Sequence, residues 1–291
     1  MKRLRILILA FFVVVFLVFL VNRIHEYVTS DYTAPVIEAE QDSLNVSVNA
    51  TEQDLLQGMT ASDNLDGDVT DTLVVVSKSK FISPGTLRVN YAAFDQNNNV
   101  GSYSRMVTYT DYIPPRFSMS QPLRFANGNS KYDYLRYITA QDSLDGNITS
   151  QIKITFGNTE TVSDTVSSQR VNLQVTNSAG DTSVLALTAT FEDYATYSMS
   201  SPALDQYIVY TQKGVKPDYR SMICGIWTAG TVRDLNKTDY DLENDFRIRD
   251  YSVNYKLPGA YIVSFQLVQH ARFTGAETEL GTTNLILIVE D

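Results

Sequence analysis

Apolar and polar residues alternate over much of the chain that follows residue 30. The alternating apolar positions are Val89, Tyr91 and Ala93, then Val171, Leu173 and Val175, then Leu185, Leu187, Ala189 and Phe191, and finally Tyr261, Val263, Phe265 and Leu267. A period of two, bounded by Gly, Asn, Asp and Pro, is typical of half-buried antiparallel strands. The pattern therefore predicts an all-β protein.

The N-terminus breaks this pattern with an unbroken apolar run, Ile6–Val21, that basic residues precede. Such a segment is either a cleaved signal peptide or a signal anchor. Cleavage needs small residues soon after the run, and the first candidate is the distant Ser30. We therefore expect a single-pass anchor over residues 6–23. Because positive charge stays inside, residues 1–5 are expected in the cytoplasm and the C-terminal region outside the cell.

Three related segments follow the apolar run. "DYTAPVI" begins at Asp31, "DYIPPRF" at Asp111 and "DYATYSM" at Asp193, with spacings of about 80 residues. In the first two segments, "RVNYAAFDQNNNVG" from Arg88 matches "RVNLQVTNSAGDTS" from Arg170. Self-similarity at a fixed period indicates a repeated structural unit.

Each unit has the size and strand content of an immunoglobulin-like β-sandwich. We predict tandem immunoglobulin-like antiparallel β-sandwiches over residues 31–111, 112–193 and 194–291, preceded by one transmembrane helix. The third unit is divergent and matches the first mainly at "PGAYIVSF", which corresponds to "PGTLRVNY". Tyr91 is a candidate tyrosine corner.

The motifs "TAPVI", "TASDNLDGDVT", "SPGTLRVNYAAFDQNNN" and "VTYTD" resemble the bacterial immunoglobulin-like domains first described in pesticidal crystal proteins. The resemblance covers 31–111 well, 112–193 fairly, and the third unit only near its end. Members of this family occur in tandem on bacterial surface and secreted proteins. The resemblance implies a spacer or adhesive role and supplies no ligand.

An acid-rich loop recurs in the first two units. "TASDNLDGDVT" at 60–70 matches "TAQDSLDGNIT" at 139–149. The candidate metal ligands are Asp63, Asp66, Asp68, Asp142 and Asp145. The favoured interpretation is a structural turn, since Asp-Gly favours tight turns, and no cofactor is expected. The alternative is a calcium site, because Ca²⁺ takes several oxygen ligands. A catalytic pair of acids is the third and least favoured interpretation.

The net charge of −10 argues against nucleic-acid binding, which needs clustered Lys and Arg. The single cysteine, Cys224, excludes an intramolecular disulfide and fits a bacterial surface protein.

The leading hypothesis is therefore a non-enzymatic, membrane-anchored module acting as a spacer, in adhesion or in cell-envelope interaction. A protein or a cell-wall polysaccharide is the candidate partner of the C-terminal domain. The rival is an envelope enzyme that uses Cys224 and His270. Cys224 lies in an apolar run, which predicts a buried and inert thiol. A signalling receptor is a third hypothesis.

Overall fold

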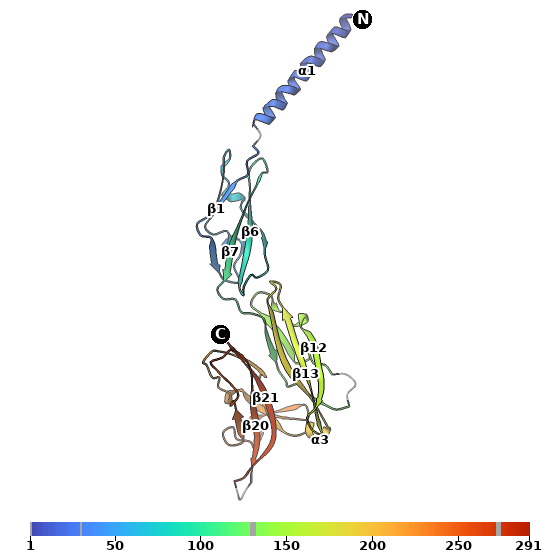
Figure 1. Ribbon diagram of the computed structural model, residues 1–291, viewed down its shortest axis with the longest axis vertical. Helices are drawn as coiled ribbons and strands as arrows, with labels where there is room; N and C mark the ends of the chain where they lie inside the picture. The colour runs from blue at the N-terminus through green and yellow to red at the C-terminus, as the bar shows by residue number, and fades with distance from the viewer. Residues whose placement is uncertain (1, 30, 129–131, 272–274) are drawn as a thin grey trace. The chain divides into compact units, whose positions relative to one another are not determined.

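The computed structural model describes residues 2–29, 31–128, 132–271 and 275–291. It divides into two compact units, Met1–Tyr112 and Ile113–Asp291. Sheets dominate both units, and one long helix stands at the N-terminus (Figure 1). The predicted all-β sandwich fold is thus confirmed.

Helix α1 (Lys2–Thr29) contains the predicted apolar segment. Its stretch Arg3–Glu26 contains an 18-residue segment with a mean hydropathy of 3.2, and none of Arg3–Glu26 is buried against the rest of the protein. The helix is long and apolar enough to cross a membrane. A signal sequence would have the same properties.

The first unit contains two sheets. One has the order β1-β3-β4 and the other β2-β7-β6-β5. The strands are β1 (Val36–Ala39), β2 (Ser43–Val46), β3 (Met59–Asp63), β4 (Gly67–Asp68), β5 (Val74–Lys78), β6 (Thr86–Phe94) and β7 (Val100–Tyr109). The short helices are α2 (Glu52–Leu55) and the 3₁₀ turn η1 (Thr70–Thr72).

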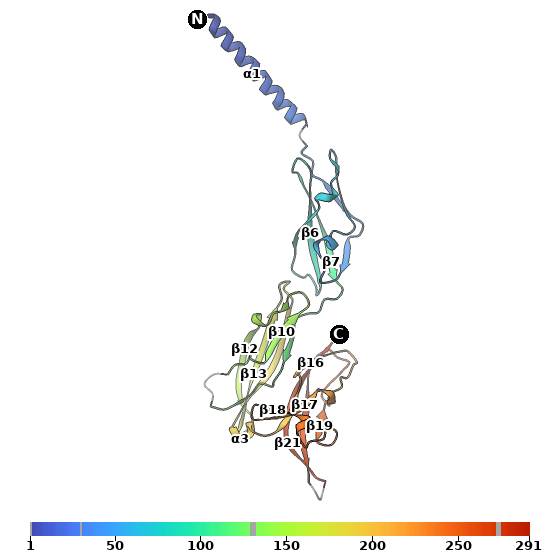
Figure 2. The same cartoon turned by 180° about the vertical axis from the view of Figure 1, so that it is seen from behind.

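The second unit contains four sheets, seen from both sides in Figures 1 and 2. The first two have the orders β11-β10-β8 and β12-β13-β14-β9. Their strands are β8 (Arg116–Met119), β9 (Arg124–Ala126), β10 (Ile138–Asp142), β11 (Gly146–Asn147), β12 (Lys153–Thr161), β13 (Val166–Thr176) and β14 (Thr182–Glu192). The 3₁₀ turn η2 (Thr149–Gln151) and helix α3 (Tyr194–Tyr197) accompany them.

The other two sheets of the second unit have the orders β15-β17-β18 and β16-β21-β20-β19. Their strands are β15 (Ser201–Leu204), β16 (Ile208–Gln212), β17 (Ile223–Thr228), β18 (Thr231–Asp234), β19 (Phe246–Arg249), β20 (Gly259–His270) and β21 (Glu277–Glu290). Two 3₁₀ turns, η3 (Arg220–Met222) and η4 (Leu235–Lys237), lie between strands.

The same strand order therefore occurs three times along the chain. We call the three pairs of sheets the first, second and third sandwich. In each one an early edge strand pairs in parallel with the last strand: β2 with β7, β9 with β14 and β16 with β21. This parallel pair departs from the purely antiparallel sheets that we predicted. It forms because the chain crosses from the first sheet to the edge of the second, where it runs alongside the last strand.

The predicted alternation places the core correctly. The inward residues of β6, β13 and β14 are buried, and those of β20 are buried except Tyr261, which is half-buried. Removing these side chains from water is the main favourable contribution to folding.

The tyrosine-corner prediction is wrong. In a tyrosine corner the hydroxyl bonds to the backbone a few residues upstream. The Tyr91 hydroxyl donates instead to the carbonyl of Leu55 in α2, 2.9 Å away and 36 positions earlier. The buried guanidinium of Arg105 donates to the same carbonyl (2.7 Å) and to that of Gln57 (3.0 Å). Together these two side chains fix α2 to the sheet.

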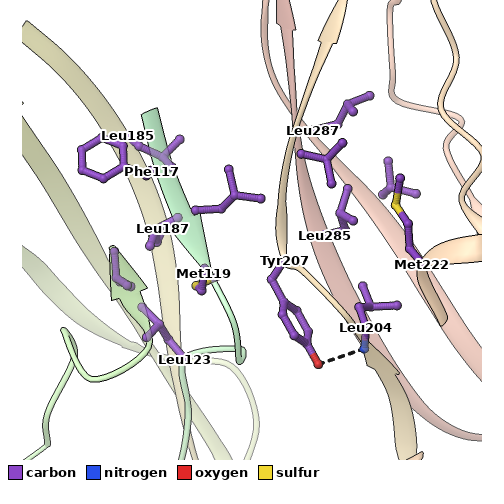
Figure 3. Close-up of a cluster of buried hydrophobic side chains, with 14 of the residues drawn as sticks. Phe117, Met119, Leu123, Leu185, Leu187, Leu204, Tyr207, Met222, Leu285 and Leu287 are labelled. Carbon is purple, nitrogen blue, oxygen red and sulfur yellow. Dashed lines mark hydrogen bonds between the residues drawn. The ribbon is translucent and has the colours of Figure 1, made fainter. Parts of the chain in front are cut away.

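A single hydrophobic cluster extends through the second and third sandwiches (Figure 3). Phe117, Met119 and Leu187 contribute from the second sandwich, and Tyr207 and Leu285 from the third. Because the two sandwiches share one core, they belong to one compact unit.

Polar contacts reinforce this junction. The backbone N–H of Tyr207 donates to the carbonyl of Met119 (2.9 Å). The N–H of Phe117 donates to the Tyr210 hydroxyl (2.8 Å). Burial raises the pKa of Tyr210 to about 12, so the phenol stays neutral.

The domain boundaries at 111/112 and 193/194 remain predictions.

Candidate functional site

The turn between β3 and β4 carries the first predicted acids. Gly67 has a φ of 73° and its counterpart Gly146 a φ of 69°, a left-handed conformation that glycine adopts readily. One carboxylate oxygen of Asp63 accepts hydrogen bonds from the N–H groups of Asp66 (3.0 Å) and Leu65 (2.9 Å). These bonds hold the pKa of Asp63 below its usual value. The contacts are those expected of a structural turn.

Asp66 and Asp145 join this turn to the turn that precedes the last strand. Asp66 accepts a hydrogen bond from the N–H of Gln96 (2.8 Å). Asp145 accepts bonds from the N–H (2.6 Å) and the hydroxyl (2.7 Å) of Ser178. Both predicted ligands thus have a structural partner in the same place of their own sandwich.

Asp68 is exposed and accepts a hydrogen bond from the N–H of Thr70 (3.0 Å). The hydroxyl and the N–H of Thr70 lower the pKa of Asp68. In the second sandwich the side-chain oxygen of Asn147 accepts the same bond from Thr149 (3.0 Å). Only an acceptor is needed here, which explains why the charge differs between the two copies.

Three carboxylates converge beside the first turn. Asp31 lies just before β1, Asp63 ends β3, and Asp95 follows β6. One oxygen from each lies within 4.8 Å of the other two. The three residues are only 9%, 9% and 6% exposed. We call Asp31, Asp63 and Asp95 the acidic cluster.

The acidic cluster is tied to the loop between β6 and β7. The N–H and the side-chain amide of Asn99 donate to the two oxygens of Asp95, at 2.7 and 2.6 Å. The same side-chain amide donates to the carbonyl of Asp31 (3.0 Å). Asn99 therefore holds two of the three segments in position.

The second sandwich has a different arrangement at the same place. Asn177 stands where the first sandwich has Asp95, and Asp181 stands where it has Asn99. The side-chain amide of Asn177 donates to Asp142 (2.7 Å), and its oxygen accepts from the N–H of Asp181 (2.9 Å). A neutral amide thus faces Asp142 where a carboxylate faces Asp63.

Of the predicted ligands, the structure brings only Asp63 into a group of carboxylates. Its partners Asp31 and Asp95 were not predicted. A signal was present, because "FDQNNNVG" and "TNSAGDTS" differ by Asp95 against Asn177. Nothing in the local pattern placed Asp31 beside them.

The acids at the other segment starts stabilise the backbone. Asp111 accepts hydrogen bonds from the hydroxyl of Ser47 and the N–H of Val48, both at 2.7 Å. Asp193 caps α3 by accepting from the N–H of Thr196 (2.8 Å). Asp111, the repeat counterpart of Asp31, is therefore engaged elsewhere.

The third sandwich carries a polar hollow of about 760 Å³. Its lining includes charged groups of both signs, a histidine and a tyrosine. We define the polar hollow by Arg233, Lys237, Asp239, Tyr240, Asp245 and His270. Groups of this kind offer many hydrogen bonds to a ligand and one amphipathic ring.

The prediction of a buried Cys224 is wrong, because the side chain is exposed on β17. The residues directly before and after it in β17 are buried. Because successive side chains of a strand point to opposite faces, the side chain at position 224 lies on the outer face. Partial burial and the nearby Asp205 raise the pKa of the thiol, which disfavours the nucleophilic thiolate. His270 contacts the carbonyl of Asn244 (2.8 Å) and the carboxylate of Asp245 (3.7 Å). The polar hollow includes His270 but not Cys224.

The chain matches no protein-family model. An uncharacterized 81.3 kDa protein of Acholeplasma phage L2 is 26% identical over 159 residues, which cover 52% of this chain and 21% of that protein. The chain thus spans about a fifth of the length of this relative.

Two of the solved structures to which the chain is similar are the following. One contains the CBM51-2 and INT domains of Clostridium perfringens ZmpB in complex with GlcNAc, with 16% identity, 53% of this chain and 41% of that chain covered, and a TM-score of 0.22. The other is human CDH23 EC21-23, with 14% identity, coverages of 89% and 100%, and a TM-score of 0.20. Scores this low do not carry over a ligand or an activity.

Proposed function

We propose that this protein is a membrane-anchored, non-enzymatic module whose sandwiches act outside the cell in adhesion or cell-envelope interaction. The observation that supports this most is the complete lack of burial of Arg3–Glu26 in α1. An apolar surface of this size is unstable in water and is stable when lipid surrounds it.

The charges around α1 support the orientation. Basic residues stand before the apolar run, and positive charge is retained on the cytoplasmic side. The remaining chain is acidic overall, which favours a soluble, mutually repelling surface.

The anchor is tested with the full chain carrying a C-terminal epitope, expressed in a bacterial host. We expect the uncleaved chain to stay in membranes after carbonate washing, and external protease to remove the epitope on intact cells. A double variant, Val14→Arg with Leu17→Arg, should leave the membrane, because each charge costs about 2.5–3.5 kcal/mol at a helix centre. A shorter chain beginning near Ser30 in the medium would show a cleaved signal peptide instead.

The polar hollow is the best candidate contact surface for a partner. It combines positively and negatively charged hydrogen-bonding side chains with the half-buried ring of Tyr240. This chemistry suits a neutral polar ligand such as a cell-wall polysaccharide, which offers hydroxyl groups and apolar ring faces.

Binding is measured by sedimenting the detergent-solubilised full chain with purified wall polysaccharide. We expect Tyr240→Ala to weaken binding about tenfold, the loss expected for an aromatic anchor. Tyr251→Ala is the matched control, because Tyr251 is exposed in the same sandwich and does not line the hollow. Equal losses for both variants would contradict the assignment of the hollow.

A further inference from the structure

The acidic cluster contains carboxylate oxygens that nothing compensates. The Oδ2 atoms of Asp31 and Asp63 are sealed from solvent, and no donor among the described residues reaches them. Buried polar groups are normally paired, and an unpaired buried charge is costly. Two such oxygens in one cluster are therefore the atoms that a bound cation would compensate.

Hydrogen bonds within the first sandwich fix the remaining oxygens of the acidic cluster. The N–H groups of Asp66 and Leu65 donate to Oδ1 of Asp63. The N–H and the side-chain amide of Asn99 donate to the two oxygens of Asp95. The carboxylates are therefore held in position, and the unpaired Oδ2 atoms of Asp31 and Asp63 are left for a ligand.

The second sandwich shows what replaces such a ligand. There the side-chain N–H of Asn177 donates to Oδ2 of Asp142, the oxygen that is left unpaired in Asp63. The repeat counterpart of Asp31 is bound to Ser47 and Val48. The second sandwich therefore satisfies its acid internally, and the first does not.

We infer that Asp31, Asp63 and Asp95 bind one Ca²⁺ ion. The donors are all carboxylate oxygens, which hard cations prefer, and no histidine or cysteine takes part. Three carboxylates supply between three and six oxygens, and water completes the 6–8 that Ca²⁺ takes. Mg²⁺ fits less well, because it demands near-ideal octahedral geometry and usually needs only one or two carboxylates.

The ion connects three segments that are distant in the sequence. It joins Asp31, where the chain leaves the α1 region, to the end of β3 and to the end of β6. Binding therefore stabilises the start of the first sandwich against local opening, and leaves the second and third sandwiches unchanged. This site is independent of the anchor and of the polar hollow.

The test uses the full chain in nonionic detergent after chelation and desalting. Isothermal titration with CaCl₂ should show one ion per chain, with a dissociation constant of about 10⁻⁴–10⁻³ M as in extracellular calcium modules. Hydrogen exchange at 5 mM Ca²⁺ should slow around residues 31–34, 60–68 and 95–101 only. No heat and no change in exchange would overturn the inference, and tighter binding of Mg²⁺ than of Ca²⁺ would overturn the choice of ion.

The sharpest variant exchanges two residues, Asp95→Asn with Asn99→Asp. It transplants the pair of the second sandwich and keeps the net charge, so we expect a folded protein that no longer responds to Ca²⁺. Asp142→Asn is the matched control and should bind Ca²⁺ as the wild type does. Unchanged binding in the exchange variant, or lost binding in the control, would place the ion elsewhere.

If exchange shows that the double variant is unfolded after chelation, Asp31→Asn replaces it. Asp31 lies outside the strands, so this change spares the sheets. Calcium binding that persists in Asp31→Asn would overturn the site.

Discussion

A charged network in the third sandwich shows how single residues stabilise a loop. The ammonium of Lys216 lies 2.6 Å from Asp250, and the Tyr255 hydroxyl donates to the same carboxylate at 2.5 Å. The hydroxyl of Tyr219 is hydrogen-bonded to the hydroxyl of Tyr255, with 2.8 Å between the two oxygens. Lys216 and then Tyr255 hold the pKa of Asp250 below its usual value.

This shift predicts a pH dependence of stability. A carboxyl whose pKa is lower in the folded state stabilises the protein above its unfolded pKa of about 3.9, and that contribution is lost as the pH falls through the folded value. Between about pH 5 and 3, the wild type should therefore lose more stability than Asp250→Asn. Urea unfolding followed by the fluorescence of Trp227, in the same sandwich, measures the difference.

Lys216→Met is the control for this pH dependence. Without the ammonium the pKa of folded Asp250 should rise toward its unfolded value, so the variant should lose less stability between about pH 5 and 3 than the wild type. Parallel pH profiles for the wild type and Asp250→Asn would show that the network contributes nothing.

At the scale of residues, the sequence allowed the turn role of Asp63 to be predicted but not its neighbours. Asp-Gly has a local geometry, which needs no knowledge of the rest of the fold. Asp31 and Asp95 meet Asp63 only through tertiary structure. The exposure of Cys224 was also mispredicted, because an apolar run on a half-buried strand still has one outward face.

At the scale of elements, β7 passes very close to the segment before β1. A Cβ atom on Gly101 would collide with the carbonyl oxygen of Pro35, which is backbone and cannot turn aside. The second sandwich has Ser183 at this position, and its hydroxyl donates to the carbonyl of Pro115 (2.5 Å). The two sandwiches therefore accommodate this close approach differently. The first has no side chain at the position, and the second has a side chain that donates a hydrogen bond.

We expect Gly101→Ala to destabilise the first unit by about 1–3 kcal/mol, the usual cost of overpacking. Hydrogen exchange of peptides from β6 and β7 should quicken, while peptides of the second unit stay unchanged. Ser183→Ala, which removes one hydrogen bond, should cost only about 1 kcal/mol. A Gly101→Ala variant as stable as the wild type would mean that the crossing relaxes freely.

Period-two alternation predicted the long strands well, since it follows from the geometry of a strand with one buried face. The parallel strands β2, β9 and β16 were not predicted. They are short, from three to five residues, and pairing direction leaves no mark in so short a pattern.

At the scale of the whole molecule, the shared core of the second and third sandwiches is the main feature that the sequence did not predict. Arg124 of β9 illustrates why. It binds Glu192 in its own sandwich (3.0 Å to Oε1), donates to Ser201 of the third (3.1 Å), and lies 4.5 Å from the ring centroid of Trp227. No local sequence pattern predicts contacts between residues so far apart in the chain.

The shared core predicts that these two sandwiches unfold together. Leu187→Ala in the second sandwich should cost about 2–5 kcal/mol. It should also lower the unfolding midpoint reported by Trp227, which lies in the third sandwich. Val107→Ala, in the core of the separate first unit, is the control and should leave that midpoint unchanged. If the unfolding midpoint reported by Trp227 is the same in Leu187→Ala as in the wild type, the two sandwiches unfold independently.

The parallel pair in each sandwich has a mechanical consequence. When the two ends of a sandwich are pulled apart, the early strand is pulled toward its N-terminal end and the last strand toward its C-terminal end. Because β2 runs parallel to β7, these two forces act in opposite directions along the strands. The hydrogen bonds between them are then loaded in shear and must break together, rather than opening one after another. The same holds for β9 with β14 and for β16 with β21, so each sandwich is built to resist tension along the chain.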